Sequence, residues 1–173
     1  MAIVPMPVAF QVRPIGPDDR DALAAFYGGL SPEGLEARFH GAGPGIAGAV
    51  ATRFCGPDHE HREGIVAIAT DGAGRPIVIG HLCLEPSTPG EVEMAIAVAD
   101  AWHRRGVGRA LLAAGIAWAR RHGLARMRAS MRADNAAIIG LVRSTGLPMW
   151  FDWADGGVVE VVIPLDVEVP RAA

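Results

Sequence analysis

Hydrophobic and polar positions divide the middle of the chain into short apolar runs separated by turn residues. The runs occupy residues 65–70, 76–84 and 92–98, and Asp71-Gly72 separates the first two. Such runs between Gly, Pro and Asp are typical of strands joined by tight turns. The pattern predicts a three-stranded antiparallel meander.

Helical patterns precede and follow this meander. Pro17 suits the first position of a helix that extends to about residue 30, and Ser31-Pro32 suits the N-cap and first position of a second helix that extends to about residue 40. The other expected elements are a strand at 9–15, a Gly-rich loop at 41–48, a short helix at 47–54, a buried helix at 105–122, a strand at 125–131, a helix at 134–144 and a closing hairpin of strands at 149–153 and 158–165.

The order of these elements predicts a mixed α/β fold in a single domain over residues 1–173. Helices and strands are grouped and do not alternate regularly, and no internal repeat or inserted domain is visible. A chain of 173 residues that is 50% hydrophobic can bury a sizeable core without disulfides or a metal.

Composition and charge narrow the function classes. The formal net charge is −3 and the charges are scattered, which disfavours a nucleic-acid or membrane-surface partner. The sequence contains no Lys, so Schiff-base and P-loop chemistry lack their usual residue. Cys55 and Cys83 form no metal-binding or redox motif, and no secretory signal or membrane-spanning stretch is visible. We expect a soluble, cytoplasmic protein without a metal.

The most informative segment connects the strand at 92–98 to the long helix through a short polar turn. Amide N–H groups at a helix start have no intrahelical acceptor and attract anions, while glycine lets a diphosphate approach the backbone closely. The candidate anion-binding residues are Arg104, Arg105, Gly106, Val107, Gly108 and Arg109. The alternative is a tight turn whose Arg side chains face solvent. A Rossmann dinucleotide site is disfavoured because Leu111 stands where a third Gly or Ala is required.

This segment resembles motif A of the GNAT acetyltransferases, whose pattern is Arg or Gln, two residues, Gly, one residue, then Gly or Ala. Here the pattern falls on His103-Arg-Arg-Gly106-Val-Gly108, with His103 in the Arg/Gln position. The helix that Asp134-Asn135 opens and Gly146-Leu147 closes resembles the family's next element. Residues 13–19 and 30–39 resemble the bacterial protein-lysine acetyltransferase branch.

The resemblance implies the GNAT fold, a central and mostly antiparallel twisted sheet flanked by helices. It implies acetyl transfer from acetyl-CoA, a cosubstrate, to the amine of a protein lysine or a small molecule. It also implies that main-chain groups of Ile96, Ala97 and Val98 bind the pantetheine arm of the cosubstrate. Asn135 would touch the pantetheine or the reaction centre, unless it serves only as an N-cap.

An amine must lose a proton before it attacks a thioester, so a general base is needed. We identify Glu93 as the candidate, because it lies in the strand that would carry the thioester and matches a glutamate of the protein-acetylating branch; the alternative is a solvated carboxylate. Glu91, Glu85 and His81 are weaker candidates.

Many relatives carry a tyrosine acid seven residues after the Asn. Val142 occupies that position here, which leaves Ser144 or a water to assist the departing thiolate.

Other functions stay open at this level. A catalytically inactive acyl-CoA-binding sensor or interaction module fits the same cradle, and the acyl group can be larger than acetyl. Trp150 and Trp153 lie near the end of the chain where family members often dimerise or shape the acceptor site, so the resemblance is compatible with a homodimer.

Overall fold

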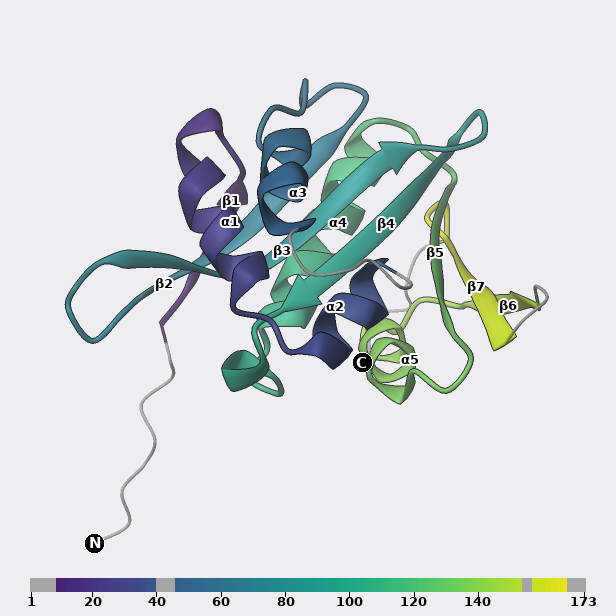
Figure 1. The fold of residues 1–173 in the computed structure, drawn as a ribbon. Coiled ribbons are helices and arrows are strands. Elements are labelled where there is room, and N and C mark those ends of the chain that lie inside the picture. The colour runs from purple at the N-terminus through teal and green to yellow at the C-terminus, as the bar shows by residue number, and fades with distance from the viewer. Residues whose placement is uncertain (1–8, 40–45, 154–156, 168–173) are drawn as a thin grey trace, which may run out of the picture.

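A computed structural model describes residues 9–39, 46–153 and 157–167 of the chain (Figure 1). Its seven strands form one sheet in the order β1-β2-β3-β4-β5-β7-β6, in which only β4 and β5 run parallel. The strands are β1 Gln11–Pro14, β2 Glu63–Thr70, β3 Pro76–Pro86, β4 Glu91–Val98, β5 Arg126–Arg132, β6 Trp150–Trp153 and β7 Val158–Pro164.

Helices cover both faces of the sheet. One face carries α1 Arg20–Gly28, α2 Pro32–Phe39 and α3 Ile46–Phe54, and the other carries α4 Val107–Arg121 and α5 Ala136–Arg143 (Figure 1). On β2, Ile65 and Ala67 face the α4 side whereas Val66 faces α1 and α3. Because both faces of these central strands are buried, their sequences are almost continuously apolar.

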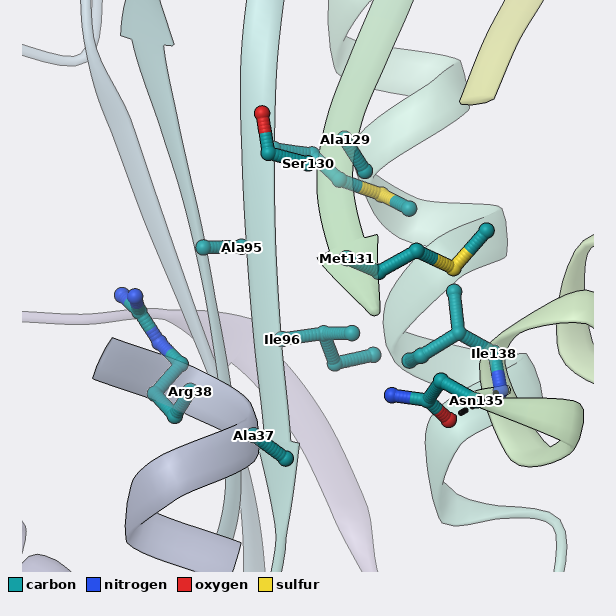
Figure 2. Close-up of a pocket in the computed structure, with 10 residues that line it drawn as sticks. Ala37, Arg38, Ala95, Ile96, Ala129, Ser130, Met131, Asn135 and Ile138 are labelled. Atoms are coloured by element: carbon teal, nitrogen blue, oxygen red, sulfur yellow. Dashed lines mark hydrogen bonds between the residues drawn. The ribbon is translucent and has the colours of Figure 1, made fainter. Parts of the chain in front are cut away.

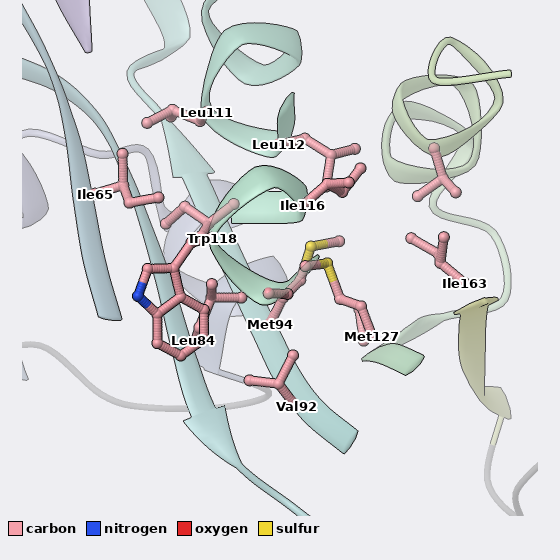
Figure 3. Packing of buried hydrophobic residues seen from close by; sticks show 14 of the residues in the cluster. Ile65, Leu84, Val92, Met94, Leu111, Leu112, Ile116, Trp118, Met127 and Ile163 are labelled. Carbon is pink, nitrogen blue, oxygen red and sulfur yellow. The ribbon is translucent and has the colours of Figure 1, made fainter. Parts of the chain in front are cut away.

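The larger core lies between α4 and the sheet. Leu111, Leu112 and Ile116 from α4 pack against residues such as Met94 and Met127 from β4 and β5 (Figure 3). Polar residues such as Arg109 and Arg120 occupy the exposed side of α4. This amphipathic pattern fixes the start of α4 against the sheet beside the end of β4.

The predicted meander is confirmed as strands β2, β3 and β4, and the predicted cap of α2 is present, since Gly34 N donates to Ser31 Oγ at 3.1 Å. The structure corrects several boundaries. The first helix begins with a 3-10 turn at Pro17–Asp19, and another such turn, at Asp100–Trp102, was not predicted. Gly48 lies inside α3, so the predicted loop ends before it, and the part of that loop at residues 41–45 lies outside the described residues.

Candidate functional site

Strands β4 and β5 separate soon after they pair. Their parallel register covers three residue pairs, from Glu91 opposite Arg126 to Glu93 opposite Arg128. β4 then continues to Val98 beside β3, and β5 continues to Arg132 beside β7, but the two strands no longer pair with each other. The sheet therefore opens into a V-shaped gap whose sides are Met94–Val98 and the last residues of β5.

The register shows which backbone groups face this gap. Gly90 O accepts a hydrogen bond from Ala125 N on the β5 side, whereas Ala99 N donates to Ile79 O on the β3 side. Main-chain groups alternate between the two sides of a strand. The N–H and C=O groups of Ile96 therefore face the gap, as do those of Val98, and those of Ala97 point to β3.

A small pocket fills the gap, and we call it the gap pocket. Its lining comes from α2, β4, β5 and the start of α5, and consists of Ala37, Arg38, Met94, Ala95, Ile96, Ala129, Ser130, Met131, Asn135 and Ile138 (Figure 2). Arg38 and Ala95 lie on one side of β4, and Asn135 and Ile138 lie on the other (Figure 2).

The turn that follows β4 presents unpaired amide groups. His103 N donates to Asp100 O at 3.2 Å and Ala110 N donates to Gly106 O at 3.0 Å. Between them, the amides of residues 104–109 have no backbone acceptor among the residues that the structure describes. Gly106 has φ 84° and Arg104 has φ 59°, so the turn is built from left-handed conformations that favour glycine. Such a turn at a helix start forms an anion cradle.

His103, the departure from the motif, closes this turn against β4. Its Nε2 donates to Val98 O at 2.9 Å. The Val98 carbonyl that faces the gap is thus already hydrogen-bonded to the imidazole. At that residue, the N–H remains as the main-chain group that can bind a ligand in the gap. This contact was not predicted, because it depends on how the turn folds back on the strand.

A larger cleft runs from the cradle to the gap pocket. Its lining comes from the end of β4, the turn and α5, and consists of Ile96, Ala97, Val98, Trp102, His103, Arg104, Gly106, Gly108, Arg109, Ala136, Ala137, Ile138, Gly140, Leu141 and Ser144. The cleft shares Ile96 and Ile138 with the gap pocket, so the two hollows adjoin.

The arginines of the turn take different places. Arg104 and Arg109 line the cleft. Arg105 lies over the Trp102 ring, with its guanidinium carbon 5.5 Å from the ring centroid, and Val107 is buried in the core below α4. Arg105 and Val107 can therefore serve the cradle through their amide groups, while Arg104 and Arg109 add positive charge.

Asn135 combines both roles that its sequence suggests. Its Oδ1 accepts a hydrogen bond from Ile138 N at 3.2 Å, which caps α5. Its side-chain nitrogen points into the gap pocket (Figure 2). The cap fixes the amide so that its donor faces the gap.

Glu93 is exposed on the α2 side of β4, at the last residue pair before the strands separate. It lies opposite Glu85 on β3. Among the residues that the structure describes, Glu93 forms no ion pair, whereas Glu85 lies 4.0 Å from Arg62 and Arg128 pairs with Glu91 and Glu160. Glu93 does not line the gap pocket.

The weaker base candidates are held in other interactions. Arg128 Nε and Arg126 Nη1 donate to the Glu91 carboxylate at 2.5 and 2.7 Å, and these bonds lower its pKa to about 2. His81 is fully buried, and burial lowers its pKa to about 3. The Tyr27 hydroxyl and His81 Nδ1 form a hydrogen bond of 2.8 Å. His81 is therefore a neutral core residue without access to substrate.

The comparisons with known proteins agree with this geometry. Residues 36–147 match the family described as Acetyltransferase (GNAT) family. The GNAT domain of S. lividans PAT superposes with a TM-score of 0.77 at 31% sequence identity, over 90% of this chain and 90% of that chain.

The chain belongs to the GNAT acetyltransferase family. Two further similar structures were solved with acetyl-CoA: yncA, described as a putative acetyltransferase from Salmonella typhimurium, and a GNAT phosphinothricin acetyltransferase from Sinorhizobium meliloti. The first has a TM-score of 0.68 and 21% identity over 95% of this chain and 96% of its own. The second has a TM-score of 0.69 and 19% identity, over 90% of this chain and 88% of its own. At these identities, both show the shared fold alone. A comparison with curated proteins gave no match.

Two other properties of this GNAT chain follow from the described residues. They contain no group of three or more His, Cys, Asp or Glu side chains placed to hold a metal ion. None of the described helices is long and apolar enough to cross a membrane. Arg38 is the charged lining residue of the gap pocket, and sequence reasoning missed it. Its place depends on how α2 packs over β4, and no local motif announces it.

Proposed function

We propose that this GNAT protein transfers the acetyl group of acetyl-CoA to the amine of a protein lysine or a small molecule. The observation that carries the proposal is the continuity of the amide cradle, the cleft and the gap between β4 and β5. Two of the structural neighbours described above contain acetyl-CoA. The two buried, unpaired cysteines, Cys55 and Cys83, favour a reducing compartment, the cytoplasm.

The residues present fit the cosubstrate. The free amides of residues 104–109 would bind its diphosphate, with Arg104 and Arg109 adding charge-assisted contacts. The Ile96 main chain and the Val98 N–H would pair with the pantetheine amides. The thioester would then lie in the gap pocket beside Ile96 and Asn135.

The reaction needs one bond exchange and two proton transfers. The neutral amine attacks the thioester carbonyl carbon, a C–N bond forms, the C–S bond breaks, and CoA departs as a thiolate. The amine loses a proton to a base, and the thiolate gains one from solvent. A main-chain N–H that faces the gap would stabilise the negative charge that develops on the carbonyl oxygen.

Glu93 is our candidate for the base. It lies two residues from Ala95 on the same side of β4, which corresponds to about 7 Å along the strand. A water molecule would bridge this distance between the carboxylate and an amine in the gap pocket. The absence of an ion pair at Glu93 among the described residues leaves its oxygens free to accept the proton.

Among the residues that the structure describes, no side chain is placed to take the part of a tyrosine acid. Val142 is fully buried in the core, and Tyr27 lies on the opposite face of the sheet. Ser144 lines the cleft, but its hydroxyl donates to Leu141 O at 2.6 Å. Because a thiolate with a pKa near 8.5 leaves readily, water suffices as the proton source.

The position of Glu93 outside the gap pocket favours one alternative, an acyl-CoA-binding module without catalysis. Its partner surface would be the edge strand β6, where Trp150 and Trp153 are 41% and 77% exposed. A homodimer would use the same edge.

Release of CoA thiol from acetyl-CoA across a panel of amines and lysine peptides separates these functions. We expect release that depends on the amine and that falls by about 10²-fold or more in Glu93→Gln. The matched control is Glu60→Gln, an exposed glutamate on the loop before β2, which should retain wild-type rates. Tight CoA binding without amine-dependent release would contradict the transferase and favour the binding module.

A further inference from the structure

Arg38, on helix α2, carries a half-buried positive charge that no carboxylate of the described residues balances. Its Nη2 donates to Cys83 Sγ at 3.1 Å, and its guanidinium carbon lies 4.7 and 5.5 Å from the ring centroids of Phe39 and Phe54. Its Nε is buried without a hydrogen-bond partner. Within the described part of the chain, no Asp or Glu lies within 4.0 Å of it. A guanidinium stays charged and has five N–H donors, so most of these donors are unused.

The groups around Arg38 supply no negative charge at neutral pH. Burial raises the pKa of Tyr27 to about 12 and also raises the pKa of the Cys83 thiol. Burial keeps His81 neutral. The surrounding aromatic rings stabilise the cation only in part, because a cation–π contact is weaker than a charge-assisted pair with a carboxylate.

Arg38 also lines the gap pocket, where it is the one charged residue. It lies on the side of β4 away from Asn135 and Ile138 (Figure 2). Ile138 is shared with the cleft that we assign to CoA. A group that extends from the CoA cleft past the thioester position would therefore meet Arg38 at the far side of the pocket.

We propose that Arg38 binds a carboxylate group of one of the two substrates and so determines the specificity of the acyl transfer. This inference rests on the proposed function. The carboxylate has two possible sources: the far end of an acyl chain, as in a succinyl or malonyl thioester, or the carboxylate of an amino acid that serves as the acceptor. The planar fork of a guanidinium matches a carboxylate in two parallel hydrogen bonds.

The charge also predicts what the pocket disfavours. A protonated amine without a carboxylate meets an unbalanced cation, whereas an acid gains the pairing that the chain itself does not provide. Pairing of a half-buried charge is favourable when the alternative leaves that charge without a partner. Acids should therefore be preferred over matched neutral analogues.

The test uses two substrate pairs, each with an acidic and a neutral member. One arm compares succinyl-CoA with acetyl-CoA and a fixed amine that lacks a carboxylate. The other compares L-leucine with L-leucinamide and acetyl-CoA. We expect one pair to show a preference for the acid in kcat/KM, and Arg38→Met to reduce that preference by about tenfold or more. The pair that responds identifies the source of the carboxylate.

Two variants separate recognition from structure. Arg38→Lys keeps the charge and should keep part of the preference, whereas a structural role alone would lower both members of a pair equally. Arg53→Met is the matched control, because Arg53 also lies over the Phe54 ring, at 5.5 Å, but does not line the gap pocket. Its ratios should equal those of the wild type.

An acid preference that is absent from both pairs, or that Arg38→Met leaves unchanged, overturns the proposal. Absence of turnover in every arm would contradict the proposed function instead. In that case, calorimetric binding of the same pairs, with CoA present for the amino acids, gives the same acid-to-neutral ratio and still decides the role of Arg38.

Discussion

Gly106 shows how a single backbone conformation prepares the cradle. Its φ of 84° lies in the left-handed region, and no atom stands within 4 Å of an added Cβ. A substitution there therefore strains the backbone without a clash. Gly108 differs, because an added Cβ would meet Leu141 Cδ atoms at 3.5 Å, an ordinary contact. This difference explains why the motif requires Gly at the first position but accepts Ala at the second.

We predict that Gly106→Ala weakens CoA binding by about tenfold, because the strained turn no longer holds its amides toward the diphosphate. Isothermal calorimetry with CoA measures the change. Gly123→Ala is the matched control, since Gly123 has φ 69°, has no atom within 4 Å of an added Cβ, and follows the far end of α4. Both variants should lose similar stability, about 1 kcal/mol. Equal CoA affinities in the two variants would contradict the cradle.

The residues of the cradle could be predicted because their signal is local. Two glycines beside arginines at a helix start need no tertiary information. Arg38 and His103 could not be placed in the same way, since one depends on α2 packing over β4 and the other on the turn folding back to the Val98 carbonyl. For Asn135, the cap that sequence suggested is also what aims the amide at the gap.

At the scale of elements, the contact between β3 and α4 sets the position of the cradle. An added Cβ on Gly80 would lie 2.9 Å from Leu111 Cδ1, 3.0 Å from Val107 Cγ1 and 3.3 Å from Ala97 O. Helix and strand are thus in direct contact at the first turn of α4, the same turn that supplies the free amides.

We predict that Gly80→Ala destabilises the fold by about 1–3 kcal/mol, because the added methyl forces α4 away from the sheet. Urea unfolding measures this loss. CoA affinity should fall in parallel, since the displaced turn contains Val107. Gly48→Ala on α3, with no atom within 4 Å of an added Cβ, should be neutral or slightly stabilising. If both alanines gave the same stability, close packing at Gly80 would be ruled out.

Elements were easier to predict than their pairing. Periodicity located the meander and the helices to within a few residues. The parallel contact of β4 with β5, and the place of β7 between β5 and β6, are set by packing between distant segments. The gap itself depends on this pairing, because the two strands share only three residue pairs before they separate.

At the scale of the whole molecule, His81 and Glu91 are among the buried groups that couple folding to pH. His81 has a folded-state pKa of about 3, against about 6.5 in the unfolded chain. Between these values the unfolded state binds more protons, so His81 contributes stability above pH 6.5 that is lost as pH falls toward 3. Glu91, whose pKa the arginines of β5 lower to about 2, acts in the same direction but only below about pH 4.3.

Between pH 6 and pH 5, the pH dependence of stability therefore reports on His81 and not on Glu91. We predict that the free energy of unfolding falls by about 1 kcal/mol over this unit of pH in the wild type, as expected when unfolding takes up one proton. In His81→Gln, whose amide can still form a hydrogen bond with Tyr27, the slope should be smaller by most of that amount, whatever the change in absolute stability. Urea titrations at the two pH values give both slopes. Equal slopes would show that His81 is not held neutral in the folded core.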